Sequence, residues 1–136
     1  MANRKKMIVG LVVLYTGLVL TGCVSSMRAS YSNLFKIYSV WQGTCDQPGY
    51  KPYPMILVIE SRKGDAFDGI TFYPKYGGGL IKVSGQIGPE NIIKFTETEV
   101  VYGKVVSGSQ YTATVKGNTL RGRYEGGEVF LRRVAD

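Results

Sequence analysis

The chain has 136 residues, a mass of 15.0 kDa and a formal net charge of +7, so it can form one small domain and a short appendage. It contains no histidine, which excludes a Ser-His-Asp triad, an imidazole base and a histidine metal ligand. Glycine (18 residues) and tyrosine (10) are frequent, whereas charged residues make up only 20% of the chain. This composition favours antiparallel β-sheet.

The first part of the chain is typical of a secretory signal peptide. Residues 3–6 read Asn-Arg-Lys-Lys, and residues 7–20 form an uncharged apolar run. A basic start, a short apolar stretch and small residues at the end are the parts of such a peptide. Because the run is shorter than the roughly 20 residues that a transmembrane helix needs, we expect residues 1–22 to be removed.

The tetrapeptide Leu20-Thr21-Gly22-Cys23 resembles the lipobox of bacterial lipoproteins. The resemblance implies cleavage before Cys23, a diacylglycerol thioether on its sulfur and acylation of its freed amine; two or more acyl chains give stable attachment. Val24 stands where lipoproteins of the inner membrane typically carry Asp. We therefore expect an envelope protein lipid-anchored to the outer membrane, facing the periplasm or the surface. The alternative is a plain signal peptide with a chance cysteine.

Removal of the signal peptide takes three cations with it and lowers the formal side-chain charge from +7 to +4. The remaining sequence has no dense Lys/Arg stretch interleaved with aromatic residues, so it gives no indication of nucleic-acid binding. With Cys23 lipidated, Cys45 has no partner for a disulfide within the chain. We expect Cys45 to be a buried, inert thiol near Trp41, with intermolecular pairing as the alternative.

From residue 38 onward the apolar residues alternate with period two, which predicts β-strands. We expect residues 23–37 to be a tether that leads to a domain spanning 38–136. Residues 97–108 are an uncertain connection that adds a strand or a lid. The eight expected strands cover residues 38–45, 55–61, 66–73, 80–87, 91–96, 109–116, 119–125 and 128–134.

Strands that are joined by tight turns pair antiparallel. A flat meander of eight strands would leave two open edges and one wet apolar face, and closure into a barrel removes both problems. Gly43, Gly85 and Gly122 fall at inward positions, where small residues let strands bend. We therefore predict an all-β fold, an eight-stranded antiparallel meander barrel, with a two-sheet sandwich as the alternative.

The region from Trp41 to Arg133 resembles the calycin barrels, which include lipocalins, avidin-like domains and small lipocalin-like bacterial lipoproteins. The matching residues are an early Trp-Gln-Gly at 41–43 and the pattern Tyr-x-x-x-Val-x-Gly-Asn-x-Leu-x-Gly-x-Tyr at 111–124. In lipocalins an arginine of the last strand packs over the first-strand tryptophan, which implies that Arg133, or else Arg132, stacks on Trp41. The order Trp-Gln-Gly departs from the lipocalin order Gly-x-Trp.

Two non-catalytic functions fit a small anchored barrel. The first is a protein-interaction or scaffolding module that the lipid holds at the membrane. The alternative is a lipocalin-like carrier of one small hydrophobic ligand inside the barrel. Both interpretations place loop tyrosines around a binding rim. The expected rim residues are Tyr50, Tyr53, Tyr73, Tyr76 and Tyr102.

We do not expect an enzyme, a cofactor or a metal site. The sequence shows no metal cluster, phosphate loop or nucleophile motif. Its candidate carboxylate pairs are Asp65 with Asp68 and Glu97 with Glu99. A spacing of two in a strand would put Glu97 and Glu99 on one side. Because they fall in an irregular stretch, we interpret both as exposed, solvated charges.

Overall fold

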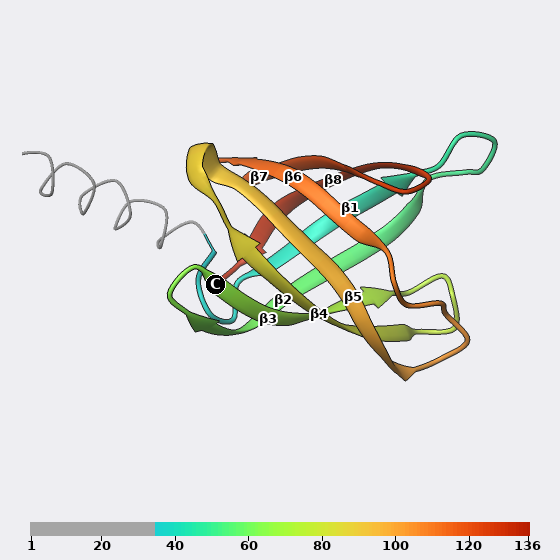
Figure 1. Ribbon diagram of the computed structural model, residues 1–136. Coiled ribbons are helices and arrows are strands. Elements are labelled where there is room, and N and C mark those ends of the chain that lie inside the picture. Colours follow the sequence, from blue (N-terminus) through green and yellow to red (C-terminus); the bar gives the residue numbers. More distant parts are fainter. Residues whose placement is uncertain (1–34) are drawn as a thin grey trace, which may run out of the picture. The chain divides into compact units, whose positions relative to one another are not determined.

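The computed structural model describes residues 35–136, which form a closed β-barrel (Figure 1). Every neighbouring pair of strands is antiparallel, and the last strand returns to pair with the first. This confirms the predicted eight-stranded meander barrel over the two-sheet sandwich. The elements are β1 (Val40–Asp46), β2 (Tyr53–Lys63), β3 (Ala66–Tyr73), β4 (Gly79–Ile87), the 3-10 turn η1 (Pro89–Asn91), β5 (Ile92–Tyr102), β6 (Gln110–Lys116), β7 (Thr119–Tyr124) and β8 (Gly127–Ala135).

Alternation of side chains along the strands builds one continuous core, as the period-two pattern predicts. On β1 the buried side chains are Trp41 and Cys45, and on β2 they are Met55, Leu57 and Ile59. Burying each large apolar side chain contributes about 1.5–3 kcal/mol relative to exposure. The other strands add Phe67, Ile81, Val83, Ile87, Ile93, Phe95, Tyr111, Ala113, Val115, Leu120, Val129 and Leu131.

Two inward glycines let neighbouring strands approach closely. A Cβ atom on Gly43 would collide with the carbonyl oxygen of Phe130 on β8. A Cβ atom on Gly122 would collide with the carbonyl oxygen of Thr112 on β6. The tight barrel therefore depends on the absence of a side chain at these positions.

An aromatic cluster closes the end of the barrel where the chain enters β1, which we call the closed end. Phe35 is fully buried, with its ring centroid 5.2 Å from that of Trp41 and 4.9 Å from that of Phe67. Arg62 Nη1 donates to the Phe35 carbonyl oxygen at 2.7 Å. The prediction of a tether over 23–37 is thus wrong at its end, because Phe35 belongs to the core.

The loops that follow β1, β3, β5 and β7 gather at the opposite end, on the right of Figure 1, which we call the open end. Strand β5 is longer than the sequence pattern indicates. It continues to Tyr102 and pairs with β4 along the way, Val100 opposite Ile81. The expected irregular connection over 97–108 is therefore a strand in its first half, and only its second half belongs to the loop before β6.

Candidate functional site

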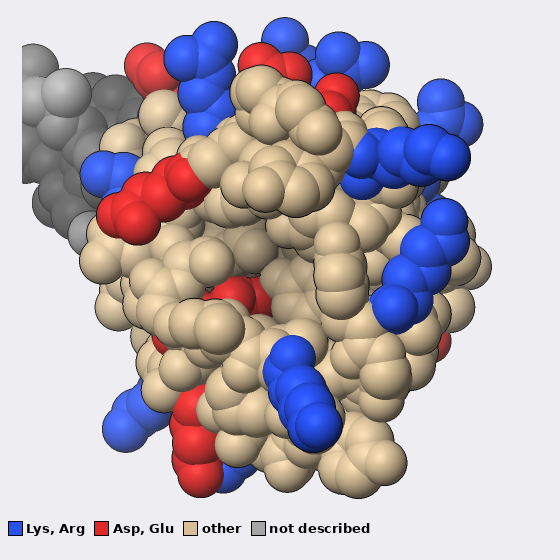
Figure 2. All heavy atoms as spheres, turned by 90° about the vertical axis from the view of Figure 1, so that its right-hand side faces the viewer, with Lys and Arg blue, Asp and Glu red and all other residues tan. Residues whose placement is uncertain are grey.

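The open end contains a hollow of about 370 Å³. Figure 2 looks onto this end and shows a depression with an acidic side chain at its floor, bordered mostly by uncharged residues. Among the described residues that line the hollow, Glu97 is the one acid and Lys104 the one base. The aromatic lining consists of Tyr53, Tyr73, Tyr76 and Tyr111.

Glu97 is held inside the barrel by hydroxyl groups of neighbouring strands. Its side chain, on β5, belongs to a residue that is only 3% exposed. Glu97 Oε1 accepts a hydrogen bond from Thr71 Oγ1 at 2.9 Å and another from the Tyr73 hydroxyl. The Tyr73 and Tyr111 hydroxyl oxygens are 3.0 Å apart. Because Tyr73 has one hydroxyl hydrogen and gives it to Glu97, Tyr111 is the donor in that pair.

The surroundings of Glu97 disfavour its charge. Burial raises the pKa of Glu97 above its ordinary value, and the hydrogen bonds from Tyr73 and Thr71 offset part of that rise. Burial also raises the pKa of Tyr73 and of Tyr111, so both phenols are neutral. The ion pairs found in residues 35–136 do not involve Glu97. The carboxyl group of Glu97 is therefore held by hydrogen bonds from hydroxyl groups and takes part in none of the ion pairs found among the described residues.

The prediction that Glu97 is exposed and lies on one side with Glu99 is wrong. Val83 of β4 pairs with Glu97, whereas the adjacent Lys82 pairs with Glu99, so Thr98 is an extra residue in β5. Such a bulge reverses the alternation that would otherwise place both acids inside. Glu99 consequently points outward and forms an exposed ion pair with Lys82, with Nζ and Oε2 3.3 Å apart.

Three of the five predicted rim tyrosines line the hollow: Tyr53, Tyr73 and Tyr76. The ring centroids of Tyr53 and Tyr76 are 5.3 Å apart in an edge-to-face arrangement, and those of Tyr53 and Tyr73 are 6.0 Å apart. Tyr50 and Tyr102 are 70% and 63% exposed and are not part of the lining. The predicted rim is therefore only partly assembled around the hollow.

Two groups that sequence analysis did not assign to a site complete the floor. Tyr111, predicted to fill the core, also lines the hollow. Glu97 continues the alternation of Ile93 and Phe95, the buried residues before it on β5. Extending the alternation of buried residues from Ile93 and Phe95 by two residues would have predicted that Glu97 points inward.

The calycin resemblance implies that Arg133 stacks on Trp41, but in the structure each of these side chains contacts other residues. The ring that packs on Trp41 is that of Phe35, and Trp41 Nε1 donates to Ser39 Oγ at 3.2 Å. Arg133 instead donates from Nε and Nη2 to Asn118 Oδ1, at 3.1 and 2.7 Å. The aromatic plug of the closed end thus occupies the place expected for an arginine.

Cys45 is the free cysteine among the described residues, and it is completely buried, as predicted. Its sulfur lies 3.3 Å from Met55 Sδ. Burial raises the pKa of the Cys45 thiol to about 12, so the nucleophilic thiolate is scarce at neutral pH. Cys23 and the expected signal peptide of residues 1–22 lie outside the described residues.

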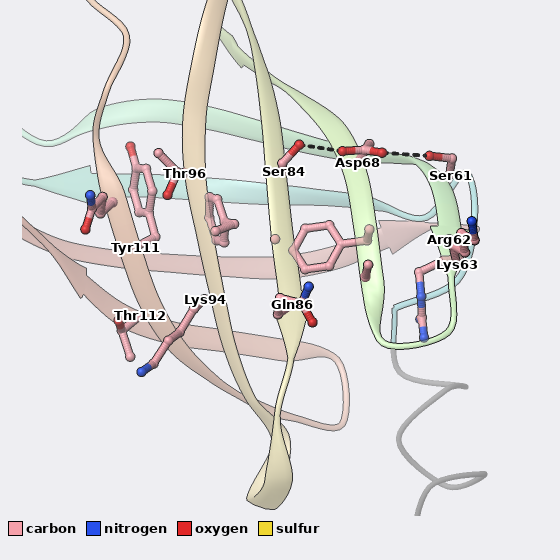
Figure 3. Close-up of a pocket in the computed structure, with 15 residues that line it drawn as sticks. Ser61, Arg62, Lys63, Asp68, Ser84, Gln86, Lys94, Thr96, Tyr111 and Thr112 are labelled. Atoms are coloured by element: carbon pink, nitrogen blue, oxygen red, sulfur yellow. Dashed lines mark hydrogen bonds between the residues drawn. The ribbon is translucent and has the colours of Figure 1, made fainter.

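A larger groove of about 710 Å³ crosses the outer wall over β2 to β6 (Figure 3). Asp68 lies there between Ser84 and Ser61 and accepts a hydrogen bond from each hydroxyl. Lys94 of β5 and Thr112 of β6 are paired neighbours that lie away from Asp68. Asp65 and Asp68, the other candidate carboxylate pair, are both exposed. Because its polar groups are spread over an open wall, we regard the hollow at the open end as the better candidate site.

Comparison with known proteins gives no assignment: no family model matches the chain, and no curated protein matches it in sequence. Within residues 35–136, no helix has the length and apolar character needed to cross a bilayer. The same residues contain no cluster of three or more acidic or cysteine side chains arranged to hold a metal ion. Proposals about function must therefore rest on the geometry of the barrel.

Proposed function

We propose that the protein is an outer-membrane lipoprotein, anchored through lipidated Cys23, whose barrel is a non-catalytic protein-interaction or scaffolding module. The lipobox-like Leu20-Thr21-Gly22-Cys23 supports the anchor. A folded domain held at the membrane by its N-terminus leaves its loops free to meet another envelope protein.

The filled interior is the observation that carries this proposal. From the plug at Phe35 to the level of Phe95, the interior is occupied by buried apolar side chains, among them Met55, Leu57 and Phe67. Eight-stranded barrels are just wide enough to be filled in this way. A long apolar ligand therefore has no room along the barrel axis, and recognition falls to the outer surface and the open end.

The alternative, a carrier of one small hydrophobic ligand, draws support only from the tyrosine-lined hollow. The floor of that hollow is the carboxyl group of Glu97 with the hydroxyl groups of Thr71 and Tyr73. An apolar ligand would strip these groups of water and give them no hydrogen bond in return. Fluorescent fatty acids, retinoids and envelope extracts test the alternative: a change in Trp41 emission or in melting temperature would support it.

Site-specific photocrosslinking in intact cells tests the proposed function. A crosslinking residue replaces Tyr50 or Val106 at the open end, or Lys63 at the closed end as the matched control; all three positions are exposed. We expect the same partner protein to be captured from the open-end positions and much less of it from Lys63. Recovery of abundant background proteins alone, or equal capture from both ends, would overturn the proposal.

The anchor is tested separately from the partner. Mass spectrometry of protein made in its native host should find residue 23 carrying a diacylglycerol group. The variant Cys23→Ser should leave the membrane fraction. A bare Cys23 in the native material would contradict the lipoprotein assignment without bearing on the crosslinking result.

A further inference from the structure

The hollow at the open end combines three features that bear on what it can bind. Its floor holds a desolvated carboxyl group, Glu97, which takes part in none of the ion pairs found in the described chain. Its wall presents phenol rings, Tyr53 and Tyr76, in edge-to-face contact. Its interior is open, with a volume of about 370 Å³.

We propose that this hollow binds a protonated amine, with the ammonium group against the Glu97 carboxylate and the stem of the amine lying against the rings of Tyr53 and Tyr76, beside the hollow that they line. The hydroxyl oxygens of Tyr73 and Tyr111 lie beside the carboxyl group and still have lone pairs to accept ammonium hydrogens. The inference concerns a site of this chain and does not depend on the membrane anchor or on the proposed partner.

An ammonium group suits each part of the lining. Glu97 supplies the opposite charge in a poorly solvated place, where a hydrogen-bonded ion pair is stronger than at the surface. The faces of the tyrosine rings attract a cation through their quadrupoles, and this attraction grows when the cation is desolvated. Hydroxyl acceptors satisfy the N–H donors that Glu97 does not reach.

Other ligand classes fit the hollow less well. An anion would meet the acid at the floor, and a purely apolar molecule would leave Glu97 and the hydroxyl groups desolvated. A metal ion takes several charged or carbonyl ligands, whereas Glu97 is the single carboxylate of the lining. The cation at the mouth, Lys104, lies on the exposed loop before β6. Because Lys104 is positively charged, the end of the amine that lies near the mouth should be neutral or anionic.

The groups that face Glu97 also determine how binding responds to pH. They are the neutral side chains of Thr71 and Tyr73 on β3, Tyr111 on β6, Ser109 in the loop before β6, and Cys45 on β1, and the one cation of the lining, Lys104, lies in that loop as well. Burial raises the pKa of Glu97, so the empty site retains its proton to a higher pH than a surface glutamate does. An ammonium ion binds the ionised form, so its affinity should rise as the pH rises through the pKa of Glu97.

The first experiment uses the full chain in a non-ionic detergent and three small probes. Calorimetry and amide NMR titrations compare n-butylammonium with n-butanol, its neutral counterpart, and with butyrate. We expect n-butylammonium to bind more tightly than either control and to shift the amide signals of Tyr53, Tyr73 and Tyr111. Equal binding of n-butanol, or shifts elsewhere only, would overturn the proposal.

Two variants that each remove one acid make the test specific. Glu97→Gln keeps the size of the side chain, and its loss of charge should lower the affinity for n-butylammonium by about tenfold or more. Glu99→Gln makes the same change two residues away on the outer face and should alter the affinity by less than about twofold. Equal effects of the two variants would mean that general charge, not the hollow, attracts the amine.

A third variant covers the case in which Glu97→Gln does not fold. Val106 lines the hollow but is 87% exposed, so Val106→Trp can narrow the mouth without disturbing the core. We expect it to abolish or strongly weaken n-butylammonium binding. Unchanged binding would place the amine outside the hollow and would contradict the proposal.

The source of the amine is decided by a second set of probes. A short neutral peptide with one lysine represents a side chain of a partner protein, and n-butylammonium represents a free small amine. Tighter binding of the peptide, lost in Glu97→Gln, would indicate that the hollow receives a lysine of a partner. Tighter binding of n-butylammonium would indicate a free amine. If neither binds, the proposal fails, even where crosslinking finds a partner.

Discussion

The two ends of the barrel are built from the same strands but filled with opposite chemistry. At the closed end, Phe35 packs against Trp41 and Phe67 and excludes water. At the open end, the interior terminates in the carboxyl group of Glu97 and a chain of hydroxyl groups that begins with Tyr73. The open end differs in that a carboxyl group lies among its buried side chains, with hydrogen bonds supplied by hydroxyl groups of the same barrel.

This difference separates what stabilises the fold from what recognises a ligand. An aromatic plug gains free energy by burial alone and needs no ligand. A buried carboxyl group costs free energy unless hydrogen bonds or a cation compensate it. The closed end therefore contributes to stability by burial alone, whereas the cost of burying Glu97 at the open end is offset in part by the hydrogen bonds from Thr71 and Tyr73.

The largest expected effect comes from breaking the closed end. Phe35→Ala removes a completely buried ring and should lower the free energy of unfolding by about 3–5 kcal/mol, as measured by urea denaturation. Ile37→Ala, in the same segment but 45% exposed, should lower it by less than about 1 kcal/mol. Similar small losses for both variants would show that Phe35 is not part of the core.

A second change tests how tightly the closed end is packed. A Cβ atom on Gly85 would collide with the Phe67 ring and lie 2.6 Å from the Lys94 carbonyl oxygen. Gly85→Ala should therefore destabilise the barrel by about 1–3 kcal/mol. For comparison, a Cβ atom on Gly88 comes no closer than 3.3 Å to a neighbouring atom, the Ile92 carbonyl oxygen. Gly88→Ala should thus cost distinctly less than Gly85→Ala in the same denaturation assay, and an equal loss at both sites would contradict the packing described.

The two ends also differ in how far the sequence predicts them. Period-two alternation predicts the strands and the inward residues of β2, β4, β6 and β7, because each side chain is placed by its own strand. The bulge at Thr98 depends instead on the pairing of β5 with β4, and no residue pattern marks it. Phe35 was missed because it precedes the period-two pattern, and its contact with Trp41 joins the chain before β1 to the core.

Part of the candidate site followed from the sequence and part did not. Tyr53, Tyr73 and Tyr76 stand at the ends of strands or in a loop, where tyrosine suggests a rim. Tyr50 lies in the β1–β2 loop shortly before β2 but is exposed, because the shape of that loop determines the direction of its side chain. Loop conformation depends on long-range contacts, so composition alone cannot separate lining tyrosines from exposed ones.

A change of pH should act on the open end and leave the closed end intact. The pKa of Glu97 is raised in the folded protein above its ordinary value of 4.5. Between those two values the folded state binds more protons than the unfolded state, so stability should fall as the pH rises. Below 4.5 both states are protonated and Glu97 contributes no pH dependence. Above the pKa of Glu97 in the folded protein, the stability lost through Glu97 no longer changes with pH.

Glu97→Gln isolates this contribution. The variant should lack the part of the fall in stability that the wild type shows above pH 4.5, as measured by urea denaturation at a series of pH values. The Phe35→Ala barrel, which retains Glu97, should keep the same pH dependence at a lower overall stability. Identical pH profiles for Glu97→Gln and the wild type would mean that Glu97 is not desolvated in the folded protein.

The smallest effect is expected from the second acid of β5, and it provides the sharpest comparison with Glu97. Glu99 pairs with Lys82 on the outer wall, where both side chains are more than half exposed. Water and salt screen such a pair, so Glu99→Gln should change the free energy of unfolding by less than about 1 kcal/mol and leave its pH dependence unchanged. Glu97 and Glu99 are the same residue type on the same strand, but because of the bulge at Thr98 the first points into the barrel and the second points outward. A large or pH-dependent effect at Glu99 would mean that the bulge is elsewhere, and that the acid at the floor of the hollow is not Glu97.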